Sequence, residues 1–313
     1  MKSNMIWAYL IQLGVNMWGQ PNSIEKRSLY YDELPTEDDI WKQVVDFLPG
    51  QGFNTVVIDV GDGIEYESHP EISTKGAWSK QKLKDELDRM RAMGLNPIPK
   101  LNFSTGHDTW LKEYSYLIAT PKYYEVCKDI ITEVAEVFGN PELFHLGMDE
   151  ETAGQQIRFN MVRYRQHDLL WHDLYFFFDM CDKVGARPWV WADPVWYNEV
   201  EYLKRMPRSV MQSNWYYGFV DKDWQGKYTT RECEAFQTLE KSGFDQIPAG
   251  SCWDRNWLNA SELMQLGKDE ISPEHLKGQF ACPWFLTRKI DLYSHLNEAL
   301  RFGEALREHY PNG

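Results

Sequence analysis

The sequence has no apolar run near the roughly 20 residues of a membrane span, and no long apolar stretch at its start that would predict a secretory leader. It is also poor in basic residues, with 33 lysines and arginines against 47 acids and a net charge of −14. Nucleic acids and anionic lipids bind to basic faces, so this balance argues against both kinds of partner. We expect a cytoplasmic protein, or one whose leader has been removed.

Other absences narrow the chemistry. No Gly-x-Gly-x-x-Gly motif follows the first apolar run, and there is no phosphate-binding loop and no internal repeat. The cysteines are scattered without a Cys-x-x-Cys pair, which favours small buried side chains over a zinc site or a disulfide framework. They are Cys127, Cys181, Cys233, Cys252 and Cys282. We therefore expect no metal and no cofactor.

Tryptophan, in contrast, is abundant, with 14 residues in a chain of 313. Part of this aromatic content belongs in a core. A surplus of tryptophan in an acidic globular chain also suits stacking against sugar rings, whose C–H faces are apolar while their edges are polar. Carbohydrate is therefore the first ligand class to consider.

Short apolar runs alternate with segments of helical periodicity along the whole chain. Eight runs are expected to be strands, at 9–15, 55–60, 97–102, 143–147, 187–191, 209–214, 245–250 and 279–283. Helices are expected at 38–47, 79–93, 121–138, 156–184, 229–242 and 292–307. Eight β/α units in about 300 residues predict an α/β fold, a single (β/α)8 TIM barrel that forms one domain over residues 1–313. A doubly wound sheet is the alternative.

In such barrels the functional groups lie at the carboxyl ends of the strands. The fourth expected strand is followed by Asp149, Glu150 and Glu151. Repulsion among three consecutive carboxylates favours the protonated form of one of them, which a general acid needs. The same acids could instead stabilise the start of a following helix. The residues alone leave both interpretations open.

The segment His145-x-Gly147-x-Asp149-Glu150 resembles the His-x-Gly-x-Asp-Glu signature of glycoside hydrolase family 20, the β-N-acetylhexosaminidases. Three weaker matches follow in the family's order. They are Gly106-His107 after the third strand, Ser213-Asn214-Trp215-Tyr216 after the sixth, and the Gly278–Trp284 segment at the eighth. The resemblance therefore covers strands three to eight and identifies the chain as a distant relative.

The resemblance implies substrate-assisted retention, in which the 2-acetamido oxygen of the sugar attacks its own anomeric carbon. Glu150 would be the general acid and base, and Asp149 would hold the acetamido N–H. Further residues would bind the substrate. Tyr216 would bond the acetamido carbonyl, Trp191, Trp215 and Trp284 would form the walls of its pocket, and His107 and His145 would support the acids.

The sequence also departs from the family pattern. Asn16 stands where the family has an arginine that grips sugar hydroxyls, and Lys100 and Asn102 replace two family acids before the Gly-His turn. The pair of catalytic acids is kept while several hydroxyl contacts are not. We therefore keep Asn16 as a candidate substrate contact and leave the natural sugar open.

Three other functions remain possible on this sequence. Glu150 could work with Asp193 or Asp59 as a two-carboxylate glycosidase on a sugar without an acetamido group. Alternatively, His107 and His145 could join Asp149 and Glu150 in binding a metal ion, although their spacing matches no metal motif. The third possibility is a barrel that binds sugar without cleaving it.

Overall fold

The computed structural model describes residues 5–20, 30–157, 159–253 and 256–311. Its eight strands are all parallel and lie side by side in the order β6-β5-β4-β3-β2-β1-β8-β7. They are β1 (Ile6–Gln12), β2 (Thr55–Asp59), β3 (Asn96–Lys100), β4 (Leu143–His145), β5 (Arg187–Trp191), β6 (Met211–Ser213), β7 (Ala249–Gly250) and β8 (Gly278–Ala281). Each of the eight lies inside or within three residues of an expected strand.

Strands β6 and β7, at the two ends of this order, meet through isolated bridges rather than a continuous ladder. Gln212 pairs with Gln246, and Trp215 pairs with Ala249. Main-chain bonds such as Ala249 N to Asn214 O (2.9 Å) complete the seam. This contact closes the sheet into a (β/α)8 barrel and excludes the doubly wound alternative.

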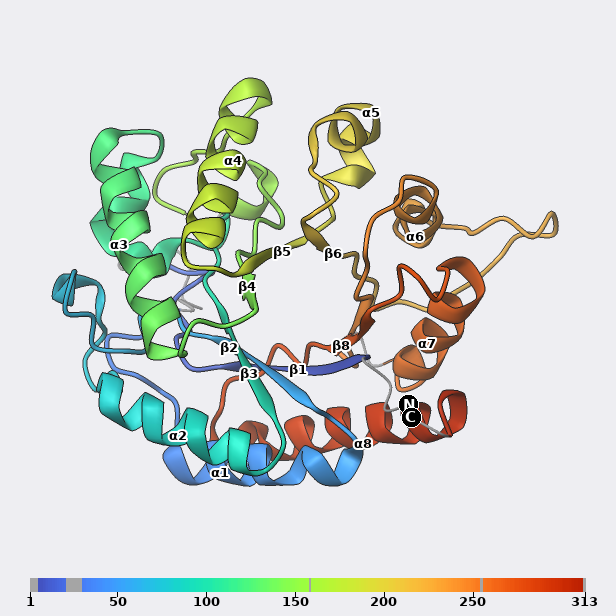
Figure 1. Ribbon diagram of the computed structural model, residues 1–313, viewed down its shortest axis with the longest axis horizontal. Helices are drawn as coiled ribbons and strands as arrows, with labels where there is room; N and C mark the ends of the chain where they lie inside the picture. Colours follow the sequence, from blue (N-terminus) through green and yellow to red (C-terminus); the bar gives the residue numbers. More distant parts are fainter. Residues whose placement is uncertain (1–4, 21–29, 158, 254–255, 312–313) are drawn as a thin grey trace.

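The helices surround the strands (Figure 1). The α-helices in the described residues are α1 (Asp38–Phe47), α2 (Lys80–Ala92), α3 (Pro121–Val137), α4 (His167–Lys183), α5 (Val195–Arg205), α6 (Arg231–Lys241), α7 (Asn259–Glu270) and α8 (Leu292–His309). Short 3-10 helices lie at η1 (Pro49–Gln51), η2 (Pro70–Ile72), η3 (Thr109–Leu117), η4 (Gly154–Gln156) and η5 (Lys289–Asp291). The hydroxyls of Ser79, Thr120 and Thr230 cap α2, α3 and α6 by accepting a main-chain N–H.

The observed helices differ from the expected ones in two ways. The helix expected from Gln156 begins only at His167, because the side chains of Arg163 and Arg165 in the intervening segment turn inward to meet buried acids. Helices α5 and α7 were not anticipated. Helix α5 follows Pro194 directly and is kinked at Asn198, so its helical periodicity is short and interrupted.

The core has two layers. Inside the barrel, apolar side chains such as Leu10, Val57, Trp189 and Phe280 fill the space between strands. A larger layer between the barrel and the helices includes Trp41 and Phe177. Because the interior is packed, the carboxyl ends of the strands are where a ligand can bind.

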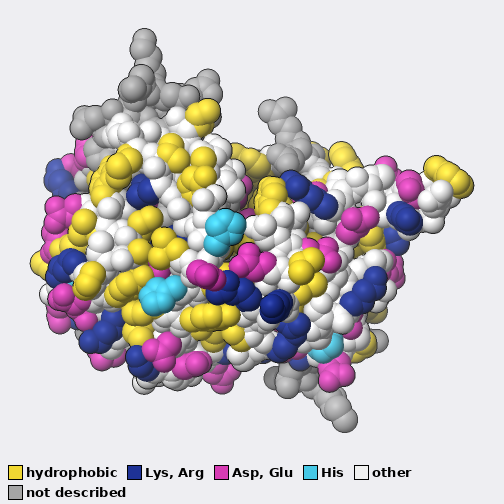
Figure 2. Space-filling model, turned by 90° about the horizontal axis from the view of Figure 1, so that it is seen from above, with side chains coloured by type: hydrophobic (Ala, Val, Ile, Leu, Met, Phe, Trp, Pro, Cys, Tyr) yellow, Lys and Arg dark blue, Asp and Glu magenta, His cyan; other side chains and the backbone are white. Residues whose placement is uncertain are grey.

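The outer surface carries acidic and basic side chains interspersed with hydrophobic ones, as one face shows (Figure 2). An arm between β6 and α6 projects from the barrel on the right of Figures 1 and 2. No helix in the described part of the chain is both long enough and apolar enough to span a bilayer.

Candidate active site

A pocket of ≈ 600 Å³ lies at the carboxyl ends of the strands. Its lining combines acids, one histidine and many aromatic rings. The side chains that line it and enter the argument below are Val15, Met17, Trp18, Tyr31, Asn102, His107, Asp149, Glu150, Gln155, Trp191, Trp215, Tyr217, Trp253, Trp284, Phe285, Leu286, Arg288 and Asp291. Most of the residues singled out from the sequence therefore meet in one place.

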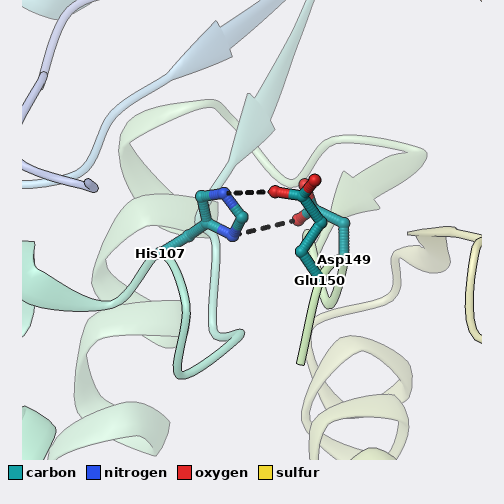
Figure 3. A group of neighbouring side chains, drawn as sticks. All are labelled: His107, Asp149 and Glu150. Carbon is teal, nitrogen blue, oxygen red and sulfur yellow. Dashed lines mark ion pairs between the residues drawn. The ribbon is translucent and has the colours of Figure 1, made fainter. Parts of the chain in front are cut away.

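His107 bridges the two acids after β4 (Figure 3). Its Nε2 lies 3.3 Å from Glu150 Oε2, and its Nδ1 lies 3.7 Å from Asp149 Oδ1. His107 is only 3% exposed, and Glu150 remains open to the pocket. The three residues form what we call the open cluster.

The charges around His107 favour its protonated form. Burial lowers the pKa of His107, but the Asp149 charge and the hydrogen bond and charge of Glu150 outweigh it and raise the pKa to about 9. Lys100, beneath the pocket, opposes this rise only in part. The open cluster therefore holds a proton between imidazole and carboxylates at neutral pH.

Asn102, after β3, fixes Asp149. Its Nδ2 donates to Asp149 Oδ1 at 2.8 Å, while its Oδ1 accepts the main-chain N–H groups of Ser104 and Met148, both at 3.1 Å. Gly147 passes so close that a Cβ there would lie 2.0 Å from Asn102 Oδ1. The glycine of the strand-4 signature is thus required for the amide to reach the acid.

Glu150 is held from both ends. Its backbone has φ +54°, in the left-handed region that costs energy for a non-glycine residue. Its N–H donates to Asp193 Oδ2 at 2.9 Å, and its Oε1 accepts from Gln155 Nε2 at 2.7 Å. Such a conformation persists only where its neighbours fix it, which places the Glu150 carboxylate toward His107.

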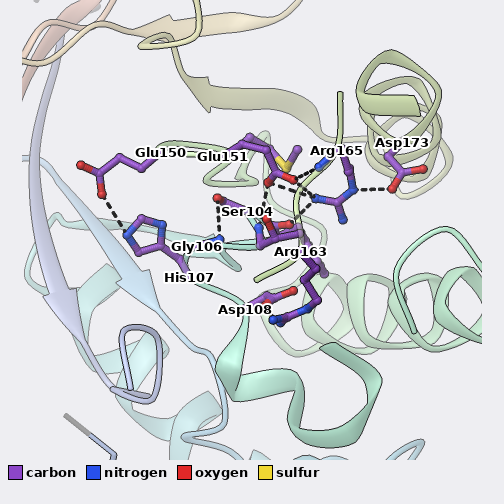
Figure 4. A network of polar contacts seen from close by, with 12 residues as sticks. Ser104, Gly106, His107, Asp108, Glu150, Glu151, Arg163, Arg165 and Asp173 are labelled. Atoms are coloured by element: carbon purple, nitrogen blue, oxygen red, sulfur yellow. Dashed lines mark hydrogen bonds and ion pairs between the residues drawn. The ribbon is translucent and has the colours of Figure 1, made fainter. Parts of the chain in front are cut away.

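Glu151 points away from the pocket, although it is the next residue in the chain. It forms an ion pair with Arg165 (3.2 Å), and Arg165 in turn bonds Asp173 (Figure 4). Arg163 pairs with Asp108 in the same buried region. The three consecutive carboxylates thus do not share one site, and separate cations relieve the repulsion expected from the sequence.

Aromatic rings form the side of the pocket beyond the acids. Trp215 and Tyr217 are stacked with ring centres 5.1 Å apart, and the Trp191 and Trp284 rings are 5.9 Å apart. Trp284 Nε1 donates to the Tyr217 hydroxyl at 2.8 Å. The three tryptophans expected here therefore lie together beside the catalytic candidates.

Tyr216 does not line the pocket, and its neighbour Tyr217 does. The Tyr216 hydroxyl bonds the Phe219 carbonyl at 3.1 Å, and its ring packs against the cluster between α6 and α7. Residues two apart on extended chain share a face. This two-residue alternation places Tyr217 on the same face as Ser213 and Trp215. The alternation would therefore have predicted Tyr217, rather than Tyr216, as the pocket residue.

Asn16 and His145 lie outside the pocket lining. Asn16 is fully buried, where its Nδ2 donates to Asp62 Oδ2 at 2.7 Å and to the Tyr31 carbonyl at 2.9 Å. His145 lies inside the barrel against Trp191, and its Nδ1 accepts the Gly147 N–H at 3.0 Å. Burial and the Lys100 charge lower the pKa of His145 well below its usual value, so it is neutral.

The acids of the two-carboxylate alternative are also turned away. Asp59 is fully buried and ion-paired with Lys100. Asp193 is 3% exposed and binds the Glu150 main chain. Neither residue lines the pocket, so neither faces a bound sugar.

A metal ion would find fewer ligands than the sequence suggested. One atom each from His107, Asp149 and Glu150 lie within 4.8 Å of one another, close enough to hold an ion. His145 is not among them, and His107 is already engaged by both acids.

No protein-family model matches the sequence, and no curated protein matches it. Solved structures do match. The barrel resembles the catalytic modules of glycoside hydrolase family 20. This agreement confirms, at the level of the fold, the distant resemblance seen in the sequence.

Three of these structures illustrate the similarity. A pneumococcal exo-β-D-N-acetylglucosaminidase with tandem family 20 modules has a TM-score of 0.59 and 14% identity, over 98% of this chain and 86% of that one. The β-N-acetylhexosaminidase of Bacteroides fragilis has a TM-score of 0.63 and 14% identity, over 94% of this chain and 65% of that one. The β-N-acetylhexosaminidase of Streptomyces coelicolor has a TM-score of 0.63 and 12% identity, over 96% of this chain and 64% of that one.

Proposed function

We propose that the protein is a glycoside hydrolase that removes a terminal 2-acetamido sugar by substrate-assisted retention. The observation that carries this proposal is the open cluster, in which His107 joins Glu150 and Asp149 beside a pocket of tryptophans. The structural similarity to family 20 enzymes supports the same reaction class. A sugar bound there would meet both acids and apolar walls.

Glu150 would supply the proton. Its Oε2 lies 3.3 Å from His107 Nε2, so the pair can share one proton. Glu150 would deliver that proton to the leaving oxygen and would then take one from the attacking water. The bond to Gln155 would keep the carboxyl directed into the pocket while its protonation changes.

Asp149 would accept a hydrogen bond from the acetamido N–H. It would also stabilise the positive charge that develops on the oxazolinium ring, which forms when the acetamido oxygen attacks the anomeric carbon. Tyr217, in place of the expected Tyr216, would donate to the acetamido carbonyl. Its hydroxyl accepts from Trp284, which leaves its own proton free to donate. Burial raises the pKa of Tyr217 well above its usual value, so this proton is retained.

Trp191, Trp215 and Trp284 would enclose the acetamido group. Excluding water from this space strengthens the hydrogen bonds to it. All three side chains line the pocket, and their rings are in contact with one another or with Tyr217.

The test is hydrolysis of chromogenic 4-nitrophenyl glycosides. The panel contains N-acetyl-β-glucosaminide, N-acetyl-β-galactosaminide, and the matching glucoside and galactoside. Glu150→Gln and Asp149→Asn are measured beside wild type, with the exposed Glu142→Gln as the matched control. We expect cleavage of the acetamido sugars alone, and a loss of about 10²-fold or more in each active-site variant.

Other outcomes separate the alternatives. Equal cleavage of plain glucosides would contradict substrate assistance. Activity that is lost with a chelator and restored by a divalent cation would favour the metal site instead. Tight sugar binding without any turnover would indicate a binding protein.

A further inference from the structure

The hydrogen-bonding groups of the pocket are unevenly distributed. Those of the open cluster come from the segments after β3 and β4, where Asn102 and Gln155 complete their bonding. These groups hold one another and the site of reaction. Other elements build the remaining sides of the pocket.

One such side is built by the segments after β1 and β8, which are neighbours in the barrel, and Trp18 there meets the His107 ring edge-on with ring centres 6.1 Å apart. We call it the apolar wall, and it consists of Val15, Met17, Trp18, Trp284, Phe285 and Leu286. The four aliphatic and phenyl side chains have no strong hydrogen-bonding atom. The indole N–H of Trp284 already donates to Tyr217.

The polar side chains just after β1 and β2 are committed elsewhere. Asn16 lies between Val15 and Met17, but its amide bonds Asp62 and the main chain of Tyr31, with Oδ1 accepting the Tyr31 N–H at 2.8 Å. Asp62 also binds Lys112 at 2.7 Å. The ends of β1 and β2 therefore hold polar side chains that turn away from the ligand space.

Polar side chains of the lining lie beside this wall, in Tyr31, Arg288 and Asp291. Arg288 Nε donates to Asp291 Oδ2 at 2.9 Å, and both side chains are half-buried. They follow Leu286 in the chain, and their bond uses only Nε, so the Nη groups of Arg288 remain for a sugar hydroxyl. A hydroxyl placed against Val15, Met17 or Leu286 lies against carbon atoms instead.

We propose that the sugar taken by this pocket is a deoxy amino sugar. Resting on the proposed function, the substrate class is a 2-acetamido sugar with a methyl group or a hydrogen in place of one hydroxyl, on the ring edge that faces the apolar wall. A hydroxyl there would lose its water without gaining a partner, whereas a methyl group would gain contact.

The first test compares four substrates on the wild-type protein. They are 4-nitrophenyl N-acetyl-β-glucosaminide and its 3-deoxy, 4-deoxy and 6-deoxy forms. Each ratio of kcat/KM is divided by the ratio for acid hydrolysis of the same pair, because removal of a ring hydroxyl itself weakens the glycosidic bond. We expect at least one deoxy form to exceed the parent by roughly 10- to 100-fold, the discrimination an apolar pocket can give for one hydroxyl.

The second test gives the wall a polar atom at unchanged volume. Met17→Gln and Val15→Thr should each reduce the preference for the deoxy form roughly tenfold. Met161→Gln and Val200→Thr make the same changes at side chains that are 46% and 82% exposed, and they should leave the preference unchanged. Thermal unfolding shows whether each variant is folded, and the substrate comparison stands without any variant.

The outcomes separate this inference from the proposed function. Cleavage of acetamido sugars with no deoxy form preferred would overturn the inference alone. Equal cleavage of plain glucosides would overturn the proposed function. If no glycoside is cleaved, calorimetry with the four methyl glycosides decides. Tighter binding of a deoxy form supports the inference, and equal or absent binding overturns it.

Discussion

Two groups of charged residues arise mainly from the same pair of segments, after β3 and β4, with Asp173 of α4 added to one of them, and they differ in their exposure and their partners. The open cluster of His107, Asp149 and Glu150 borders the pocket. A closed cluster lies behind it, formed by Asp108, Glu151, Arg163, Arg165 and Asp173 (Figure 4). The side chain of Glu150 is 28% exposed and that of Glu151 is 4% exposed.

The difference teaches how one short segment serves two purposes. His107 and Glu150 meet across the open cluster, and their next neighbours Asp108 and Glu151 pair with arginines in the closed one. The left-handed backbone at Glu150 sends consecutive side chains in different directions. Side chains that border the pocket and side chains that are buried in ion pairs are thus separated residue by residue. Substitutions in the open cluster should reduce activity, and those in the closed cluster should reduce stability.

The largest effect should come from Glu150→Gln. Loss of the proton donor should lower kcat/KM on an acetamido glycoside by about 10³-fold. Because this side chain is partly solvated and shares the stabilisation of protonated His107 with Asp149, the free energy of unfolding should fall by only about 1–2 kcal/mol at neutral pH. Steady-state kinetics and urea unfolding measure the two quantities. A large loss of stability would contradict the separation of the clusters.

Arg165→Met should break the closed cluster. It would leave Glu151 and Asp173 buried without their cation, at a cost of about 3–5 kcal/mol in unfolding free energy. Glu151→Gln should act in the same direction with a smaller effect. Urea unfolding provides the measurement. Unchanged stability would show that the buried ion pairs are dispensable.

The pKa of His107 predicts how stability depends on pH. Because the folded protein raises this pKa from 6.5 to about 9, protonation stabilises the fold. The contribution, roughly 3 kcal/mol, should be complete below pH 6.5 and lost as pH rises through 9. Unfolding at pH 6 and pH 9.5 should show this decline in wild type. His107→Gln should lack it, and an equal decline in the variant would assign the effect to other groups.

The smallest effect is expected at Gln155. Its bond to Glu150 Oε1 lies at the exposed side of the open cluster. Removing this bond in Gln155→Ala should leave the Glu150 carboxyl less well oriented and raise the activation free energy by about 1 kcal/mol. We therefore expect kcat/KM to fall severalfold, with stability unchanged. Gln166→Ala, at another exposed glutamine, is the control. A loss as large as that of Glu150→Gln would mean that Gln155 itself takes part in the reaction.

The sequence was sufficient for the barrel because strand periodicity and helix ends are local signals. It was also sufficient to predict that His107 and Glu150 follow neighbouring strands at the same end of the barrel. It could not predict that the segment of Arg163 and Arg165 is not helical, since Arg163 pairs with Asp108, 55 residues earlier in the chain, and burial of these ion pairs is a tertiary property. Nor could it show that Asn16 bonds Asp62, because the residue type is the same whether an asparagine side chain faces a ligand or the protein interior.

The seam between β6 and β7 has a kinetic consequence. Strand β7 has only two residues, and isolated bridges join it to β6. Trp215 and Tyr217 stand directly after β6, so they rest on a seam of isolated bridges. We expect amide hydrogens at this seam to exchange fastest among the strands. Opening there would let the aromatic side of the pocket relax and widen the way out for a bound ligand.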